Sequence, residues 1–485
     1  MTGICEPSRR RCGAETPLAR AIASLPVAFG ALFIGITMAL AEPNEGTVPP
    51  TGIPEPSIAS SLPANGDPQG VRAALAGRGI TYKVNYGAEV FGVADGGIRR
   101  GSKYIGQLEG LVNVDFSRLM GWHGLTFLAH AYQLHGRGIS ASHLGVFDPV
   151  TNYEATPSTR LFELWLEQAM FNDKLSIRFG QMRVDYEGEF VNSQTAGLFI
   201  SASFGWPAFL GANLPSGGVT YPIISPGIRL KAAPTTNSTF LLGVYNDDPA
   251  GPCAGDPQVC NNDGLKFRLQ DDPFVIAEVQ YKYGDNKVDN GLNGMVKVGG
   301  FVDLGKFGDK RFSNDGLSLA DPLSNGIARI YHENYGLYAV IDQQVYRSPT
   351  AQNGDAGIYT FGRIAGLPST RNVVDFSFDI GIKFNGLSAS RPNDEFGFAF
   401  VHNRVSNRLS DLDLDTMRFG GSSIPVRSTE SLAEFTYKAQ IIPGLIIQPD
   451  VQYVWRPGGN ASDPKEPTRS VENAWVFGLR SVINY

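Results

Sequence analysis

Charged residues are scarce in this sequence. Lys, Arg, Asp and Glu make up 18% of its 485 residues, whereas about 25% is usual for a soluble domain. Cysteine is rarer still, because the chain has four and two of them, Cys5 and Cys12, lie near the N-terminus. The six histidines show no metal-ligand spacing. We therefore expect neither a metal site nor a cofactor, and the low charge suggests surroundings other than water alone.

Long apolar runs are also missing after residue 41. No window offers the 18 or more consecutive apolar residues that a membrane-spanning helix requires. Glycine is abundant, with 57 residues, and 29 Phe, 18 Tyr and 5 Trp make up 11% of the chain, which argues against intrinsic disorder. Any passage through a membrane must therefore use strands.

The first 41 residues have the features of an export signal. Four arginines precede an apolar, small-residue stretch at 21–38, and Ala39-Leu40-Ala41 forms an A-x-A cleavage site. An uncleaved membrane anchor is the alternative. Removal of residues 1–41 takes away four arginines and two glutamates and changes the net charge from −6 to −8. Such an acidic product has no electrostatic reason to bind nucleic acid.

The two cysteines beyond this leader are close in sequence. Cys253 and Cys260 lie in a stretch rich in proline and aspartate, and an exported chain favours a disulfide between them. The loop closure would be worth about 2 to 3 kcal/mol in the chain-entropy model. Two free thiols are the alternative.

Strict alternation marks the strands. Every second residue from Val374 to Phe384 is apolar and those between are polar or glycine, which is the period of a strand with one apolar face. Comparable segments of about ten residues recur down the chain. They predict 16 strands, at 80–94, 102–116, 125–135, 160–171, 175–186, 228–235, 239–247, 272–283, 292–303, 335–346, 357–365, 373–385, 395–405, 429–441, 445–456 and 473–485.

The connections alternate between short polar turns and long loops, as they do in outer-membrane barrels. A sheet in a bilayer must close on itself, because hydrocarbon offers its backbone no hydrogen bonds. We predict an all-β fold, a closed antiparallel transmembrane β-barrel at 80–485 that is wide enough for an aqueous channel. Residues 42–79 are expected to form a tether and a short periplasmic helix, with Asp67 as N-cap and Pro68 at the first position.

Several motifs carry a resemblance that spans nearly the whole mature chain. They include Gly66-Asp67-Pro68, Gly121-Trp122-His123-Gly124, Leu164-Trp165-Leu166-Glu167-Gln168, Phe204-Gly205-Trp206-Pro207, Pro226-Gly227-Ile228-Arg229-Leu230, Gly255-Asp256-Pro257-Gln258 and Pro449-Asp450-Val451-Gln452-Tyr453. In these motifs and their order, the sequence resembles the OprB-type carbohydrate-selective porins. The resemblance implies a 16-stranded barrel in the outer membrane of a Gram-negative bacterium that passes glucose and related sugars passively, without enzyme activity.

Strand parity selects candidate channel residues. A Lys or Arg facing lipid costs about 2 to 4 kcal/mol at the midplane, so the charged face of each strand should line the pore. Carboxylates, Arg and Trp suit sugar hydroxyls and ring faces, and an ion-pair lattice that stiffens the wall is the alternative role. The strand candidates are Glu109, Glu163, Trp165, Glu167, Arg178 and Glu278.

The loop 187–227 is the longest and contains Phe204, Trp206 and Tyr221. Loops of this length are usually functional or disordered. We expect it to fold inward and narrow the channel, and an external lid packed on its own aromatics is the alternative.

Other readings remain open. A porin for other small solutes is one alternative, and a secreted soluble β-rich enzyme acting on polysaccharide is another. Glu163 and Glu167 lie about 13 Å apart along one strand, too far for a glycosidase pair. Besides sugars in transit, we expect contacts with outer-membrane lipid and lipopolysaccharide. Arg99, Arg100 and Lys103, near the first external turn, are either lipopolysaccharide contacts or cations at the pore mouth, and strand parity does not decide between these roles. Copies of the chain could form a homo-oligomer.

Overall fold

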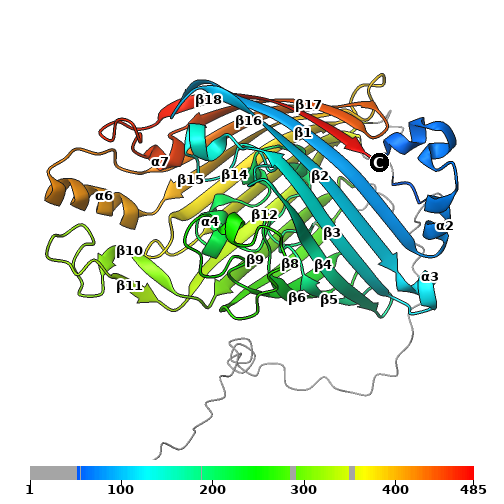
Figure 1. The fold of residues 1–485 in the computed structure, drawn as a ribbon, viewed down its shortest axis with the longest axis horizontal. Coiled ribbons are helices and arrows are strands. Elements are labelled where there is room, and N and C mark those ends of the chain that lie inside the picture. Colours follow the sequence, from blue (N-terminus) through cyan, green and yellow to red (C-terminus); the bar gives the residue numbers. More distant parts are fainter. Residues whose placement is uncertain (1–51, 55, 187, 285–290, 349–355) are drawn as a thin grey trace, which may run out of the picture.

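Sixteen antiparallel strands close into a barrel in the computed structural model (Figure 1). They follow the order β1-β18-β17-β16-β15-β14-β13-β12-β9-β8-β7-β6-β5-β4-β3-β2. The predicted signal peptide and most of the tether lie outside the described residues. The structure describes residues 52–54, 56–186, 188–284, 291–348 and 356–485.

Each of the 16 predicted strands is present, so the predicted fold is confirmed. Most ends agree within about three residues, and β5 is the exception. The barrel strands are β1 Ile80–Gly97, β2 Gly101–Asp115, β3 Leu125–Gly136, β4 Ser158–Met170, β5 Leu175–Gln181, β6 Pro226–Ala232, β7 Ser238–Asn246, β8 Pro273–Tyr283, β9 Gly294–Asp303, β12 Asn334–Arg347, β13 Gly357–Gly366, β14 Val374–Asn385, β15 Glu395–Val405, β16 Thr429–Ile442, β17 Leu445–Trp455 and β18 Glu472–Asn484.

Apolar side chains cover the outside of the barrel and polar ones its inside. On β14, Asp375, Ser377 and Asp379 are buried, whereas Ile380 is 56% exposed. Phe398, Phe435, Phe477, Leu337 and Val298 on other strands are exposed in the same way. An apolar band around a charged interior is the arrangement that lipid outside and water inside would select.

The two ends of the barrel differ. Helix α2 (Val71–Gly77) and the C-terminus lie at one end, and the hairpin of β10 (Phe307–Ser313) and β11 (Ala328–Tyr331) lies at the other (Figure 1). The short turns, such as 171–174, join strands at the α2 end. By the rule that long loops are external, the α2 end is the one expected to face the periplasm.

Helix α2 begins later than predicted. Its N-cap is Gly70, with φ of +69°, and not Asp67, because the turn through Pro68 is completed before the first helical residue. Asp67 still satisfies a main-chain group of the helix, since its Oδ2 accepts a hydrogen bond from Ala73 N at 3.0 Å.

The region around α2 fastens the seam where β1 meets β18. Arg72 is buried, lies over the rings of Tyr82 and Tyr485, and donates from Nη2 to Tyr82 O at 3.0 Å. The Tyr485 hydroxyl donates to Gly66 O at 2.8 Å. The last residue of the chain is thereby tied to the segment that precedes the first strand.

The long loops contain structure that strand periodicity did not predict. Arg311 on β10 forms ion pairs with Asp411 (2.6 Å) and Asp415 (2.8 Å). These aspartates lie on α6 (Asn407–Gly420), so a hairpin and a helix from separate loops support each other. Among the described residues, the helices are too short or too polar to cross a membrane. The remaining α-helices in the described part of the chain are α3 Phe116–Met120, α4 Ala208–Gly211, α5 Pro257–Cys260 and α7 Pro457–Asn460.

Candidate functional site

The chain between β5 and β6 leaves the barrel wall and turns into the interior. The predicted strand 175–186 is wrong beyond Gln181, because Gly180 adopts φ of +136° and the ladder with β4 ends there. A Cβ on Gly180 would lie 2.3 Å from Leu164 O, so this close approach requires glycine. Residues 182–186 and 188–225, which we call the inward segment, follow this bend.

Carboxylates on distant strands hold the inward segment by its main chain. Glu278 on β8 accepts a hydrogen bond from Val191 N at 2.8 Å, and Glu434 on β16 accepts one from Ile200 N at 2.6 Å. Because β8 and β16 are six places apart in the barrel order, the segment crosses the lumen. The expected infolding is therefore what the structure shows, and the external lid is not.

Arg363 on β13 supports the middle of the inward segment. Its guanidinium donates to Ser203 O at 2.7 Å and to Gly205 O at 3.0 Å, and it forms an ion pair with Asp379 at 2.8 Å. Both charged side chains are 1% exposed. The position of the inward segment thus depends on the Arg363 guanidinium, which is shielded from water and paired with Asp379 and with main-chain carbonyls of the segment.

Aromatic packing completes the attachment. Phe204 is 2% exposed, and its ring lies 5.1 Å from Phe199 and 6.2 Å from Phe361 on β13. Rings at such separations add about 0.5 to 1.5 kcal/mol beyond their area burial. The inward segment is thus packed against the inner face of the wall.

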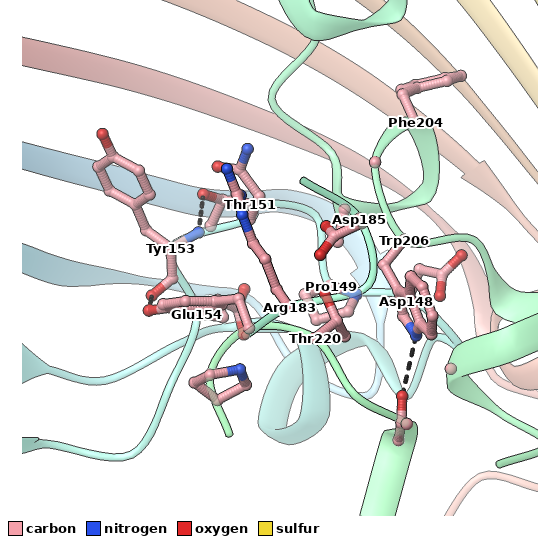
Figure 2. Close-up of a pocket in the computed structure, with 18 of the residues that line it drawn as sticks. Asp148, Pro149, Thr151, Tyr153, Glu154, Arg183, Asp185, Phe204, Trp206 and Thr220 are labelled. Atoms are coloured by element: carbon pink, nitrogen blue, oxygen red, sulfur yellow. Dashed lines mark hydrogen bonds between the residues drawn. The ribbon is translucent and has the colours of Figure 1, made fainter. Parts of the chain in front are cut away.

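A cavity of about 930 Å³ remains beside the inward segment. It is bounded by that segment, by residues 147–154 and by the inner faces of β2 and β3. In Figure 2, Arg183 lies between Tyr153 and Glu154 on one side and Asp148 and Trp206 on the other. The volume lies within the range of small-molecule sites. Its lining includes Gln107, Glu109, Tyr132, Asp148, Tyr153, Glu154, Arg183, Asp185, Asn192, Gln194, Phe204, Trp206, Thr220, Tyr221, Asp256 and Gln258.

Several buried polar atoms in this lining have no hydrogen-bond partner in the described part of the chain. They are Asp148 Oδ2, Arg183 Nε, Asp185 Oδ1 and Asn192 Oδ1. Arg183 Nε lies 4.0 Å from Glu163 Oε2, which is too far for a hydrogen bond. An unsatisfied buried polar group costs about 1 to 3 kcal/mol, so these atoms favour water or a hydroxylated solute in the cavity.

The cavity lining is predominantly acidic. Besides its tyrosines, its ionisable groups are five carboxyls and one guanidinium, on Glu109, Asp148, Glu154, Asp185, Asp256 and Arg183. Burial raises the pKa of the Asp148 and Glu154 carboxyls to about 7 each. Burial disfavours the charge of Arg183, but the carboxylates of Asp185 and Glu163 outweigh it and raise the pKa of the guanidinium. A fixed cation therefore stands among carboxyls, of which two ionise near neutral pH.

Aromatic side chains form the rest of the cavity lining. Tyr221 donates from its hydroxyl to Tyr153 O at 3.0 Å, and its ring meets that of Tyr132 edge-on at 5.6 Å. Trp206 donates from Nε1 to Gly217 O at 2.9 Å. The rings are held at fixed angles by these contacts and present apolar surface beside the unpaired polar atoms.

Four of the nine predicted channel residues line this cavity. They are Glu109 on β2 and Phe204, Trp206 and Tyr221 on the inward segment. Glu109 also accepts a hydrogen bond from His130 at 2.8 Å. The sequence singled out these aromatics because of the length of their loop, and the structure brings them to one place.

The other five lie in the wall outside this lining. Glu167 pairs with Arg178 at 2.7 Å and with Arg229 at 2.9 Å, and the Arg178 guanidinium lies 4.3 Å from the ring centre of Trp165. These contacts form the ion-pair lattice that the sequence left as an alternative. Glu163, with His130 at 3.1 Å, and Glu278, which holds the inward segment, are likewise buried in wall contacts.

Sequence reasoning missed Arg183, Asp185, Asp148, Tyr153 and Glu154. Arg183 and Asp185 fell within the predicted strand, where their alternation with Met182, Val184 and Tyr186 imitated a wall segment. The other three lie between β3 and β4, where no periodic signal exists.

The cysteine pair that the sequence favours as a disulfide is bonded in the structure. Cys253 and Cys260 form a disulfide, and Asp256 and Gln258 between them belong to the cavity lining. Within the described residues, no group of three or more His, Cys, Asp or Glu side chains has an arrangement suited to a metal ion.

Comparison with known proteins agrees with this architecture. Residues 99–485 match the family model described as "Carbohydrate-selective porin, OprB family". Porin B of Pseudomonas aeruginosa is 25% identical over 442 residues, covering 86% of this chain and 89% of that protein. A protein of Acinetobacter baylyi named "Putative porin QuiX" is 23% identical, covering 87% and 92%.

A solved structure shares the fold. The high-pH structure of Pseudomonas putida OprB superposes with a TM-score of 0.74 at 23% identity, covering 86% of this chain and 97% of that one. The family match spans well over half of this chain. The chain thus belongs to the OprB family of carbohydrate-selective porins, which are β-barrel proteins of the Gram-negative outer membrane.

Proposed function

We propose that this porin carries small neutral carbohydrates such as glucose by passive diffusion, and that the 930 Å³ cavity is their narrow passage. The supporting observation is the combination of unpaired polar atoms on Asp148, Arg183 and Asp185 with the aromatic faces of Trp206 and Tyr221 in one lining. The family and the barrel imply a channel, and we infer that the chain has no enzyme activity.

The chemistry of the lining suits an uncharged, hydroxylated solute. A sugar that enters must exchange its hydration for hydrogen bonds, and Arg183 offers donors while Asp148 and Asp185 offer acceptors. The apolar face of a sugar ring can lie against the rings of Tyr153, Trp206 or Tyr221. These interactions are spread over separate side chains, so binding is weak enough to allow release, as conduction requires.

The charge of the lining supports a further preference. Five carboxyls face one guanidinium, so an anionic sugar meets a repulsive field. We infer that neutral sugars pass faster than sugar acids of similar size. This preference for neutral solutes separates the proposal from a general porin for other small solutes.

The surroundings are part of the proposal. Lipid would contact the exposed apolar faces of the strands. Arg99 and Arg100 lie at the external turn between β1 and β2, and Lys103 lies near the start of β2, where all three would meet lipopolysaccharide phosphates. Arg100 is exposed and forms an ion pair with Asp95.

Liposome swelling tests the assignment of the cavity. Purified chain is reconstituted, and influx of glucose is compared with that of tetraethylene glycol, a neutral solute of similar mass with two hydroxyls. We expect faster glucose influx in the unaltered protein. Arg183→Gln should bring the two rates together, whereas Arg100→Gln, a matched change at the exposed turn, should leave their ratio unaltered. Equal rates in the unaltered protein, or an unchanged ratio in Arg183→Gln, would contradict the proposal.

A further inference from the structure

Five aspartates gather at the external rim of the barrel. Asp247 and Asp248 follow β7, Asp271 and Asp272 precede β8, and Asp303 ends β9. These three strands are neighbours, and Asp247 N donates to Asp272 O at 3.0 Å. The topology therefore brings together acidic groups that are up to 56 positions apart in the sequence.

Two of the five have ordinary structural partners. Asp271 accepts two hydrogen bonds from the Arg268 guanidinium, at 2.6 and 2.8 Å. Asp248 Oδ1 accepts hydrogen bonds from Ser216 Oγ at 2.6 Å and Gly251 N at 3.0 Å. These contacts account for both side chains without any ligand.

Asp247 and Asp303 are different. They are 6% and 0% exposed, and Asp247 Oδ1 and Asp303 Oδ2 have no hydrogen-bond partner in the described structure. Asp303 Oδ1 accepts one hydrogen bond, from Gly305 N at 2.9 Å. The nearby cation, Arg268, is engaged by Asp271. These two buried carboxyl groups, which lie within hydrogen-bond reach of each other, thus have no counter-ion among the described residues.

The two carboxylates face the same small space. A Cβ placed on Gly305 would lie 2.8 Å from Asp247 Oδ2 and 3.0 Å from Asp303 Oδ1. Burial, reinforced by the charges of Asp303 and Asp271, raises the pKa of the Asp247 carboxyl to about 9. The two buried acidic groups therefore require a compensating positive charge, which either a proton or a metal ion can provide.

We propose that Asp247 and Asp303 bind one Ca²⁺ ion at the external rim. Ca²⁺ prefers six to eight oxygen ligands, and two carboxylates balance its charge while their unpaired oxygens supply ligands. No third acidic side chain completes a metal cluster among the described residues. Main-chain carbonyls and water fill the remaining positions, which suits a modest affinity of about 0.1 to 1 mM, typical of extracellular calcium sites.

The position of the site gives it a structural consequence. Asp247 begins the loop 247–272, which carries the disulfide, and Asp303 belongs to the barrel wall. In that loop Gln258 Oε1 accepts a hydrogen bond from Thr156 N at 2.7 Å, beside the cavity. Bound Ca²⁺ would fasten the loop to the wall, and any effect of this on solute passage rests on the proposed function.

Calorimetric titration of the full chain tests the proposal. The protein, folded in detergent and stripped with EDTA, is titrated at neutral pH with CaCl₂ and separately with MgCl₂. We expect one Ca²⁺ per chain and at least tenfold weaker binding of Mg²⁺, because Mg²⁺ gives up its water reluctantly and requires a near-ideal octahedral arrangement of ligands. Asp303→Asn should lower the Ca²⁺ affinity at least tenfold, and Asp321→Asn, on a separate external loop, should leave it unchanged.

Folding is checked separately. Heat-dependent gel mobility shows whether each variant is a closed barrel, and Asp303→Asn should fold because an amide relieves the carboxylate repulsion. No Ca²⁺ binding by the unaltered chain would overturn the proposal and indicate that the pair shares a proton. Unchanged Ca²⁺ affinity in folded Asp303→Asn would overturn it as well. Neither readout depends on transport, so failure here leaves the proposed function untouched.

Discussion

Arg363 and Asp379 lie opposite each other on β13 and β14 and form an ion pair of 2.8 Å in which both side chains are 1% exposed. The same guanidinium holds the main chain at Ser203 and Gly205. This buried charge therefore joins the barrel wall to the middle of the segment that crosses the lumen, alongside Glu278 and Glu434. The width of the passage should depend on this charge.

Removal of the charge at this position should widen the channel. In Arg363→Gln, Asp379 loses its counter-charge and the carbonyls of Val191, Ser203 and Gly205 lose their guanidinium donor. Breaking a buried pair in this way costs about 3 to 5 kcal/mol. We expect the inward segment to detach, so single-channel conductance rises and a trisaccharide enters liposomes. Unchanged conductance in a folded Arg363→Gln barrel would show that the segment is held without this contact.

A second substitution separates two effects of Arg363→Gln: the unpaired charge left on Asp379, and the hydrogen bonds that the main chain of the inward segment loses. Asp379→Asn added to Arg363→Gln removes the unpaired carboxylate but does not restore the donors to Ser203 and Gly205. We expect recovery of heat stability in the double variant without recovery of the original conductance. Recovery of both would attribute the first effect to the stranded carboxylate alone.

Selectivity between neutral and anionic sugars should depend on pH. Burial raises the pKa of Asp148 and Glu154 to about 7, so both are protonated at lower pH and become charged as the pH rises through that value. The cavity thus becomes more negative between about pH 6 and pH 8. The influx of glucuronate relative to glucose should fall several-fold over this range.

The matched variant for this pH effect is Asp148→Asn with Glu154→Gln. It lacks both titrating groups, so its ratio of glucuronate to glucose influx should be independent of pH in that interval. A ratio that rises with pH in the unaltered protein would contradict the assigned groups.

The disulfide should hold the loop at the mouth of the cavity. Loss of a bridge between residues seven positions apart costs about 2 to 3 kcal/mol in the chain-entropy model. In Cys253→Ser with Cys260→Ser we expect faster cleavage of the loop 247–272 by protease in intact outer-membrane vesicles, while the barrel itself stays closed. An unchanged cleavage rate would mean that Asn261 and Arg268 already immobilise the loop.

The barrel was predictable from local pattern, and the cavity was not. Alternation such as Asp375 against Phe376 follows from lipid on one side of every strand and water on the other, so each strand carries its own signal. The inward segment has no such rule, because Val191 and Ile200 are held by Glu278 and Glu434, partners 87 and 234 positions away. Arg183 shows most clearly what the sequence pattern cannot predict. Residues 182–186 alternate between apolar and polar side chains as a strand of the wall would, although the chain has already left the wall at Gln181.

Cysteine labelling of the passage tests the central claim most directly. Gln194 is exposed and lines the cavity, and Cys253 and Cys260 are paired, so in Gln194→Cys a bulky methanethiosulfonate reagent has a defined target. We predict that labelling abolishes glucose-driven liposome swelling, whereas labelling of Leu323→Cys, 85% exposed on the external loop, leaves swelling unchanged. Undiminished glucose influx after complete labelling of Gln194→Cys would show that sugar does not pass through this cavity.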